Sequence, residues 1–177
     1  MRTMLSFLAG GLILVLGVPP AGAQPGLPKP GPEHEMLKKF EGQWDATVSF
    51  AGGESKGTAH YKLGLGGFWL QLHFKGDFGG ATFEGTGLTG YDPRKKKYVS
   101  SWADSMEPGL MVMEGAFDKD GKTFTEAGEG PGMDGKLHKM KSVYNFKDKD
   151  TIVFTMYQEA DGKDQQMMQI TYKRAKK

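Results

Sequence analysis

Cysteine is absent from the 177 residues of this chain. Its absence excludes a disulfide-stabilised scaffold, a metal site built on thiolates and a cysteine nucleophile. Charge is nearly balanced, with a formal net charge of +2, so nothing in it points to nucleic acid as a partner. The hydrophobic content of 38% is sufficient for one packed core, which excludes global disorder.

Glycine, in contrast, is abundant: the chain has 27, about twice the usual share. A glycine inside a helix destabilises it by ~1 kcal/mol, so long helices and coiled coils are excluded. No Gly-X-Y repeat is present, which excludes collagen. In a strand-rich fold, glycine would instead occupy turns and the bends of curved strands.

The first 23 residues have the pattern of a secretory signal peptide. Arg2 provides a positive start, residues 4–18 form an apolar run, and Ala21-Gly22-Ala23 is an A-x-A cleavage pattern. The alternative is a membrane anchor, but the run is shorter than the ~20 apolar residues that a spanning helix needs. We therefore expect cleavage before Gln24 and an exported protein, periplasmic or secreted, with no membrane span.

Residues 24–32 (QPGLPKPGP) are dominated by proline and glycine, which predicts an extended tether. A short amphipathic helix is predicted over residues 33–41, because its apolar residues share one helical face and Gly42 follows it. Residues 33–177 are expected to form a single domain that begins with this helix.

After Gly42 the hydrophobic period changes from 3.6 to 2. Trp44, Ala46 and Val48, for example, alternate with polar residues, as in a strand with one face in a core. Gly-Gly, Asp-Gly and Asp-Pro pairs separate such segments and indicate turns. These signals predict ten strands, over residues 44–50, 57–64, 68–76, 82–90, 97–105, 110–117, 122–128, 136–146, 151–159 and 165–173.

Short connections between successive strands favour an antiparallel meander. A sheet of ten strands avoids exposed edges most simply by closing into a barrel. The predicted fold class is therefore all-β, a single antiparallel meander β-barrel of about ten strands with one short N-terminal helix. A barrel of this size is wide enough to hold a small ligand.

Continuing the alternation along each strand places aromatic residues, methionines and a few polar groups inside the barrel. Ligand pockets have such apolar walls with a few placed polar groups, but a filled barrel requires the same apolar positions, so both interpretations stay open. The candidate ligand-binding residues are Tyr61, Tyr98, Trp102, Asp104, Met111, Met113, His138 and Met140.

Asp104 is the most informative of these candidates, since a buried carboxylate is unfavourable unless it is paired. It is expected either to anchor a ligand or act as an acid in catalysis, or to lie at the rim and cap a turn near Glu107. His138 is either a ligand anchor or an ordinary core or rim histidine. An enzyme with Asp104 and His138 as an acid–base pair is thus one alternative, although no catalytic residue can be assigned.

Three other sequence patterns resemble cofactor or metal sites but lack features that such sites need. Residues 85–90 match G-x-G-x-x-G, but no helix follows to complete a dinucleotide site. The acidic turn at 118–121 lacks the later ligands of a calcium loop, and no two histidines have metal-ligand spacing. We therefore expect neither a metal nor a cofactor.

A longer pattern resembles a known family. Its segments are Pro32-Glu33-His34, Gly42-x-Trp44, Gly66-Gly67-Phe68-Trp69-Leu70, Gly85-x-Gly87-x-x-Gly90-Tyr91-Asp92, Trp102-x-Asp104-Ser105 and Tyr172-Lys173-Arg174. Together they resemble the exported bacterial proteins of domain-of-unknown-function family 1579, over nearly the whole mature chain. The resemblance implies a lipocalin-like barrel and no established activity.

Gly42-Gln43-Trp44 also looks like the G-x-W signature that opens the first strand of lipocalins and related barrels. In such barrels a basic residue of the last strand often packs on the tryptophan, a part that Arg174 or Lys173 would take here. The resemblance therefore implies structural roles for Gly42, Trp44 and Arg174.

These patterns predict a protein that binds a small apolar or amphipathic molecule. Two alternatives stay open, the enzyme described above and a filled barrel that acts as a cell-envelope interaction module. Neither the ligand nor the oligomeric state follows from the sequence.

Overall fold

Ten strands follow one short helix in the computed structural model, which describes residues 28–132 and 134–176. The helix is α1 (Pro32–Leu37), and a 3-10 turn, η1 (Leu65–Gly67), separates the second and third strands. The strands are β1 (Gly42–Phe50), β2 (Gly53–Gly64), β3 (Trp69–Phe78), β4 (Ala81–Asp92), β5 (Lys97–Asp104), β6 (Met111–Phe117), β7 (Thr123–Pro131), β8 (Leu137–Asp148), β9 (Thr151–Ala160) and β10 (Lys163–Arg174). The predicted signal peptide lies outside the described residues.

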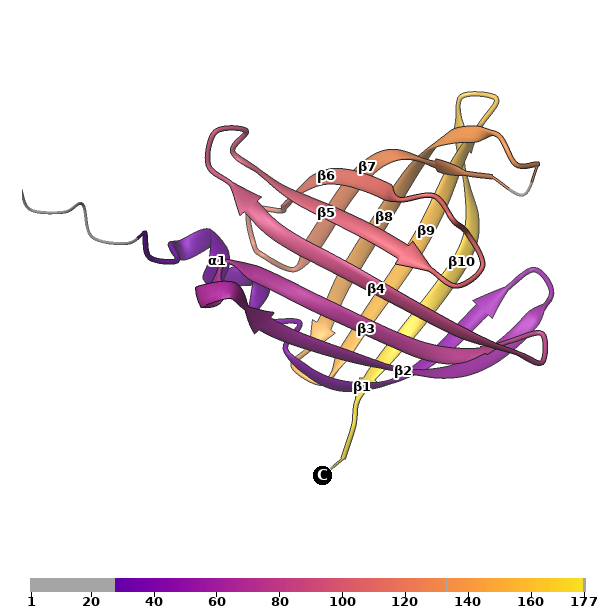
Figure 1. Cartoon of the computed structure of the whole chain (residues 1–177), viewed down its shortest axis with the longest axis horizontal. Coiled ribbons are helices and arrows are strands. Elements are labelled where there is room, and N and C mark those ends of the chain that lie inside the picture. Colours follow the sequence, from indigo (N-terminus) through magenta and orange to yellow (C-terminus); the bar gives the residue numbers. More distant parts are fainter. Residues whose placement is uncertain (1–27, 133, 177) are drawn as a thin grey trace, which may run out of the picture.

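Every strand pairs antiparallel with the next along the chain, and β10 pairs with β1 to close the barrel. The closing seam runs from the pair Trp44–Arg174 to the pair Phe50–Met168. Figure 1 shows the strands wrapped around a common interior, with α1 against one end of it. The predicted all-β meander barrel is therefore confirmed.

The two ends of this barrel carry different connections. At the α1 end lie α1, η1 and the turns that follow β4, β6 and β8. The turns that follow β1, β3, β5, β7 and β9 lie at the opposite end, called the far end below, on the right of Figure 1. Because α1 covers only one end, the two halves of the interior have different surroundings.

Helix α1 is shorter than the predicted helix over 33–41. After Leu37 the backbone forms tight turns in which each N–H bonds to a carbonyl three residues back, such as Phe40 to Leu37. These turns carry Phe40 into the barrel, where its carbonyl oxygen accepts a 2.8 Å hydrogen bond from the Trp44 indole. Gly42, with a φ of 124°, then directs the chain into β1. No helix among the described residues is long and apolar enough to cross a membrane.

All ten predicted strands are present, and the differences are at their ends. Strand β2 begins at Gly53 instead of residue 57, because the first hairpin is tight and pairs Phe50 with Gly53. Strand β3 begins at Trp69 instead of residue 68, because η1 extends to Gly67, which has a positive φ. The predicted alternation holds in β1, where Trp44, Ala46 and Val48 are buried.

Aromatic rings fill the interior at the α1 end. Phe40 lies 4.9 Å from Phe146 and 5.2 Å from Tyr144 between ring centroids, and Phe117 packs 4.8 Å from Phe124. We call these five residues the aromatic plug. Such pairs contribute about 0.5–1.5 kcal/mol each beyond the burial of their surface. The plug therefore closes and stabilises the barrel beneath α1.

Candidate functional site: an internal cavity

Between the aromatic plug and the far end the barrel is hollow. A cavity of about 450 Å³ begins at Phe40 and Phe124 and extends to Phe78 and Met106, which are partly exposed at the far end. Its volume lies within the range of small-molecule sites, ~300–1,000 Å³. Most of its wall is apolar, with side chains that include Leu70, Leu72, Phe74, Phe154, Met156 and Ile170. The interior therefore offers an apolar compartment that reaches the surface at the far end.

Five of the eight candidate ligand-binding residues line this cavity: Tyr61, Trp102, Asp104, Met111 and Met113. The other three do not. Tyr98 belongs to the packing at the α1 end, where its ring lies 5.2 Å from Phe117 and its hydroxyl donates a 2.7 Å hydrogen bond to the Glu33 carbonyl. Burial raises the pKa of Tyr98 to about 12. Its position indicates that it anchors α1 to the barrel.

Met140 and His138 lie on β8 and do not line the cavity. The His138 ring contacts the Asp134 carboxylate in the adjoining turn at 2.8 Å. Strand β8 is three strands from β5, which carries Asp104, so the structure does not bring these two residues together at the cavity. Among residues 28–132 and 134–176, no group of three or more potential acidic or histidine ligands is arranged to hold a metal ion.

Asp104 lies at the cavity rim and organises its surroundings. One carboxylate oxygen accepts a 2.8 Å hydrogen bond from the Trp102 indole, and the other accepts 2.9 Å bonds from the backbone of Met106 and Glu107. The Trp102 ring lies against Gly85, where an added Cβ would come within 2.2 Å of it. Asp104 therefore fixes both the turn after β5 and a large aromatic ring of the cavity wall.

Gly42, Trp44 and Arg174 interlock where the barrel closes. The Arg174 guanidinium lies 4.1 Å from the centre of the Trp44 ring, and its Nη1 donates a 2.7 Å hydrogen bond to the Glu41 carbonyl. A Cβ on Gly42 would approach that nitrogen to 2.5 Å. This contact joins the first and last strands and lies outside the cavity wall.

Glu126, on β7, is a buried acidic residue of the cavity that the sequence interpretation missed. Its side chain is only 6% exposed, and each of its oxygens accepts one hydroxyl hydrogen bond, from Ser100 at 2.7 Å and from Ser142 at 3.0 Å. Burial raises the pKa of this carboxyl, and the two hydroxyl bonds oppose the effect. A carboxyl group is thus held in a fixed orientation inside an apolar cavity.

A glycine makes this arrangement possible. Ser100 lies on β5 and Glu126 on β7, so β6 runs between them, and the β6 residue paired with Glu126 is Gly115. A Cβ on Gly115 would lie 2.6 Å from Glu126. Because Gly115 has no side chain, Glu126 reaches across β6 to Ser100. The signal for an inward Glu126 was its spacing of two from Phe124, a residue of the plug.

Two tyrosines, Tyr61 and Tyr144, lie close to the carboxyl group, and Tyr172 lies next to Tyr61. The Tyr61 hydroxyl is buried without a hydrogen-bond partner among the described residues, although Tyr172 lies close enough to influence it. Burial raises the pKa of Tyr61, Tyr144 and Tyr172 well above the ordinary value, so all three stay neutral. An unpartnered buried hydroxyl is unfavourable, and a bound molecule can supply the missing partner.

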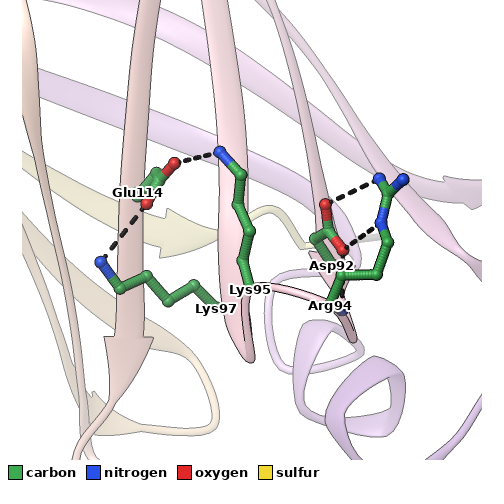
Figure 2. A network of polar contacts seen from close by, with 5 residues as sticks. All are labelled: Asp92, Arg94, Lys95, Lys97 and Glu114. Carbon is green, nitrogen blue, oxygen red and sulfur yellow. Dashed lines mark hydrogen bonds and ion pairs between the residues drawn. The ribbon is translucent and has the colours of Figure 1, made fainter.

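The outer wall carries a separate charged network. Arg94 pairs with Asp92 at 3.0 Å, and Glu114 is bridged by Lys95 and Lys97 (Figure 2). The Arg94 guanidinium lowers the pKa of Asp92 to about 2. These groups lie on the outer face of the barrel, and none of them lines the cavity, so they are not part of the site.

Two solved structures are similar in fold. An S-type phycobiliprotein lyase, CPES, from Guillardia theta has a TM-score of 0.54 at 12% identity, over 81% of this chain and 92% of that chain. A de novo designed fluorescence-activating β-barrel has a TM-score of 0.45 at 16% identity, over 78% and 96%. At 12% identity, the likeness to the lyase shows the barrel fold alone.

At the level of sequence, the family described as "Protein of unknown function (DUF1579)" matches residues 29–174, as the resemblance predicted. No curated protein matches the chain in sequence.

Proposed function

We propose that this chain, which belongs to the DUF1579 family, binds a small apolar or amphipathic molecule inside its barrel. The observation that carries the proposal is the hollow of about 450 Å³ between the aromatic plug and the far end. Packed interiors contain few voids larger than a water molecule, so a purely structural barrel has no need of this space. The same hollow argues against the filled barrel that acts only through its surface.

The polar groups of the wall would orient the ligand. Glu126 and Tyr61 present a carboxyl group and an unpartnered hydroxyl at the inner end of the cavity, beside the plug. Trp102, held by Asp104, lies near the rim. An elongated ligand would therefore enter at the far end with its polar group first and leave its apolar part against the methionines and aliphatic residues.

Titration with the neutral fluorescent dye Nile red tests this proposal. The expected result is saturable binding of one dye per chain with a blue-shifted emission. Met111→Trp places a larger side chain in the cavity wall and should weaken binding by about tenfold or more. Val112→Trp, one residue along β6, is the matched control because Val112 is 48% exposed on the outer face. Equal effects of the two variants, or a wild type that binds no dye, would contradict the proposal.

The proposed site of action is outside the cytoplasm, periplasmic or extracellular. It rests on the signal-peptide pattern of residues 1–23. Expression of the full chain in a bacterium, followed by cell fractionation and intact-mass measurement, tests it. The expected product begins at Gln24 and is absent from the cytoplasmic fraction; a product that keeps residues 1–23 in the cytoplasm would refute export.

A further inference from the structure

The charged groups of the cavity all have one sign. Its described wall contains four carboxylates and neither lysine, arginine nor histidine. Glu126 lies at the inner end, and the other three, Asp77, Asp104 and Glu107, lie at the far end. A low-dielectric cavity lined by one sign of charge concentrates ligands of the opposite sign.

Glu126 lacks a compensating charge. Its two bonds come from the neutral hydroxyls of Ser100 and Ser142, which leave room for further donors on its oxygens. The titratable groups that interact with it from other strands are Tyr61 and Tyr144, with Tyr172 next to Tyr61, and all three are neutral. A buried carboxylate without a cation is unfavourable, so a cationic ligand would gain what the protein itself does not provide.

Aromatic faces surround the same position. Phe40, Phe124 and Tyr144, together with Tyr61, line the cavity beside Glu126. Aromatic rings attract cations through their negative faces, most strongly where water is excluded. A carboxylate with aromatic side chains around it is therefore complementary to an organic ammonium group.

We propose that the cavity selects amphipathic organic cations, amines with an apolar body, whose ammonium group lies at Glu126 and whose apolar part extends toward the far end. The inference rests on the proposed binding function and deepens it. Alkyl carboxylates of the same size are disfavoured, because their charge would meet Glu126 at the inner end and three acidic residues at the entrance. Asp77, Asp104 and Glu107 accept hydrogen bonds from neutral groups, such as the Gly80 N–H, the Trp102 indole and the Gly109 N–H. These bonds leave the negative charge of the entrance in place, and that charge attracts cations.

Three twelve-carbon probes test the selection: dodecylamine, dodecanol and dodecanoate. Each is titrated at pH 7, below the concentration at which it forms micelles or separates from solution, by displacement of Nile red from the full mature chain. Dodecylamine is expected to bind about tenfold or more tightly than dodecanol, which corresponds to ~1.4 kcal/mol, and dodecanoate is expected to bind weakest. An amine that binds no better than the alcohol would overturn the proposal.

Glu126→Gln identifies the residue responsible, since the amide keeps the shape and hydrogen-bonding capacity without the charge. In this variant the affinity for dodecylamine relative to that for dodecanol should fall to less than about twofold. The matched control is Glu84→Gln, a surface carboxylate paired with Lys75. If Glu126→Gln keeps the full preference for the amine, the proposal is wrong.

The outcomes separate the two proposals. If no probe and no dye binds, the proposed binding function fails. If the alcohol binds and the amine has no advantage, the cavity still binds apolar molecules and only the selection of cations fails. The wild-type comparison of the three probes does not depend on whether the variants fold.

Discussion

Phe40 at the α1 end is 2% exposed and contacts other rings on several sides, whereas Phe78 at the far end is 39% exposed and borders the cavity. The same residue type serves stability in one half and a binding surface in the other. The two ends differ in what closes them. At the α1 end, the turn after α1 places Phe40 inside the barrel, whereas no comparable segment among the described residues fills the far end. The barrel therefore separates a half that holds it together from a half that is free to bind.

The largest effect is expected when the α1 end is opened. Trp44→Ala removes a side chain that is 1% exposed, its hydrogen bond to Phe40 and its contact with Arg174. The loss of unfolding free energy should be about 3–5 kcal/mol, measured by urea denaturation. Phe78→Ala at the far end is the comparison and should lose less than ~1.5 kcal/mol. Similar losses for the two variants would show that the halves do not differ as described.

The next effect concerns the buried carboxyl group and has a defined sign. Because the folded pKa of Glu126 is raised above its ordinary value of 4.5, the folded state holds its proton more tightly than the unfolded state. The free energy of unfolding is therefore expected to fall by up to ~1.4 kcal/mol per pH unit as pH rises above about 4.5. Above the folded pKa of Glu126 it should no longer change with pH.

Glu126→Gln should remove this dependence, so that the variant gains stability relative to wild type between pH 4 and pH 7. Thermal unfolding across that range is the measurement, with Glu84→Gln as the surface control. A variant that follows the wild-type pH profile would mean that the carboxyl is not buried as described.

The smallest effect on stability is expected at the outer network of Figure 2. Arg94→Gln should let the pKa of Asp92 rise from about 2 toward its ordinary value of 3.8, as read from carboxyl-carbon NMR shifts. The melting temperature and dye affinity should not change measurably, because the ion pair is in solvent. A clear loss of either would show that the outer wall contributes more than this account allows.

The sequence predicted the barrel because local signals determine it. Two-residue alternation, as in Trp44, Ala46 and Val48, specifies which face of a strand is buried, and glycine-containing turns specify where strands end. The helix length was wrong because the helix ends early to place Phe40 inside the barrel. There its ring packs against Tyr61, Tyr144 and Phe146 of distant strands, and no local pattern encodes those contacts.

The site was predictable only in part. Alternation placed a few polar groups inside, but it could not show that Ser100 and Ser142 would both bond to Glu126 across neighbouring strands. Glutamate side chains are rarely buried, so the residue type argues against an inward-facing Glu126. Its spacing of two from Phe124 nevertheless favours the inward orientation. Alternation also could not distinguish plug from cavity, because both use inward-facing residues; that division depends on where Phe40 is inserted.

Methionine methyl NMR tests this account most directly, because methionines occur on the cavity wall, on other surfaces of the barrel and, as Met36 of α1, at the α1 end. Five line the cavity, Met106, Met111, Met113, Met156 and Met168, while Met36, Met140 and Met167 do not. On titration with dodecanol, the account predicts saturable shifts of the cavity-lining methyl signals and little change at Met36 and Met167. Shifts of equal size at all methionines, or none at saturating dodecanol, would contradict it.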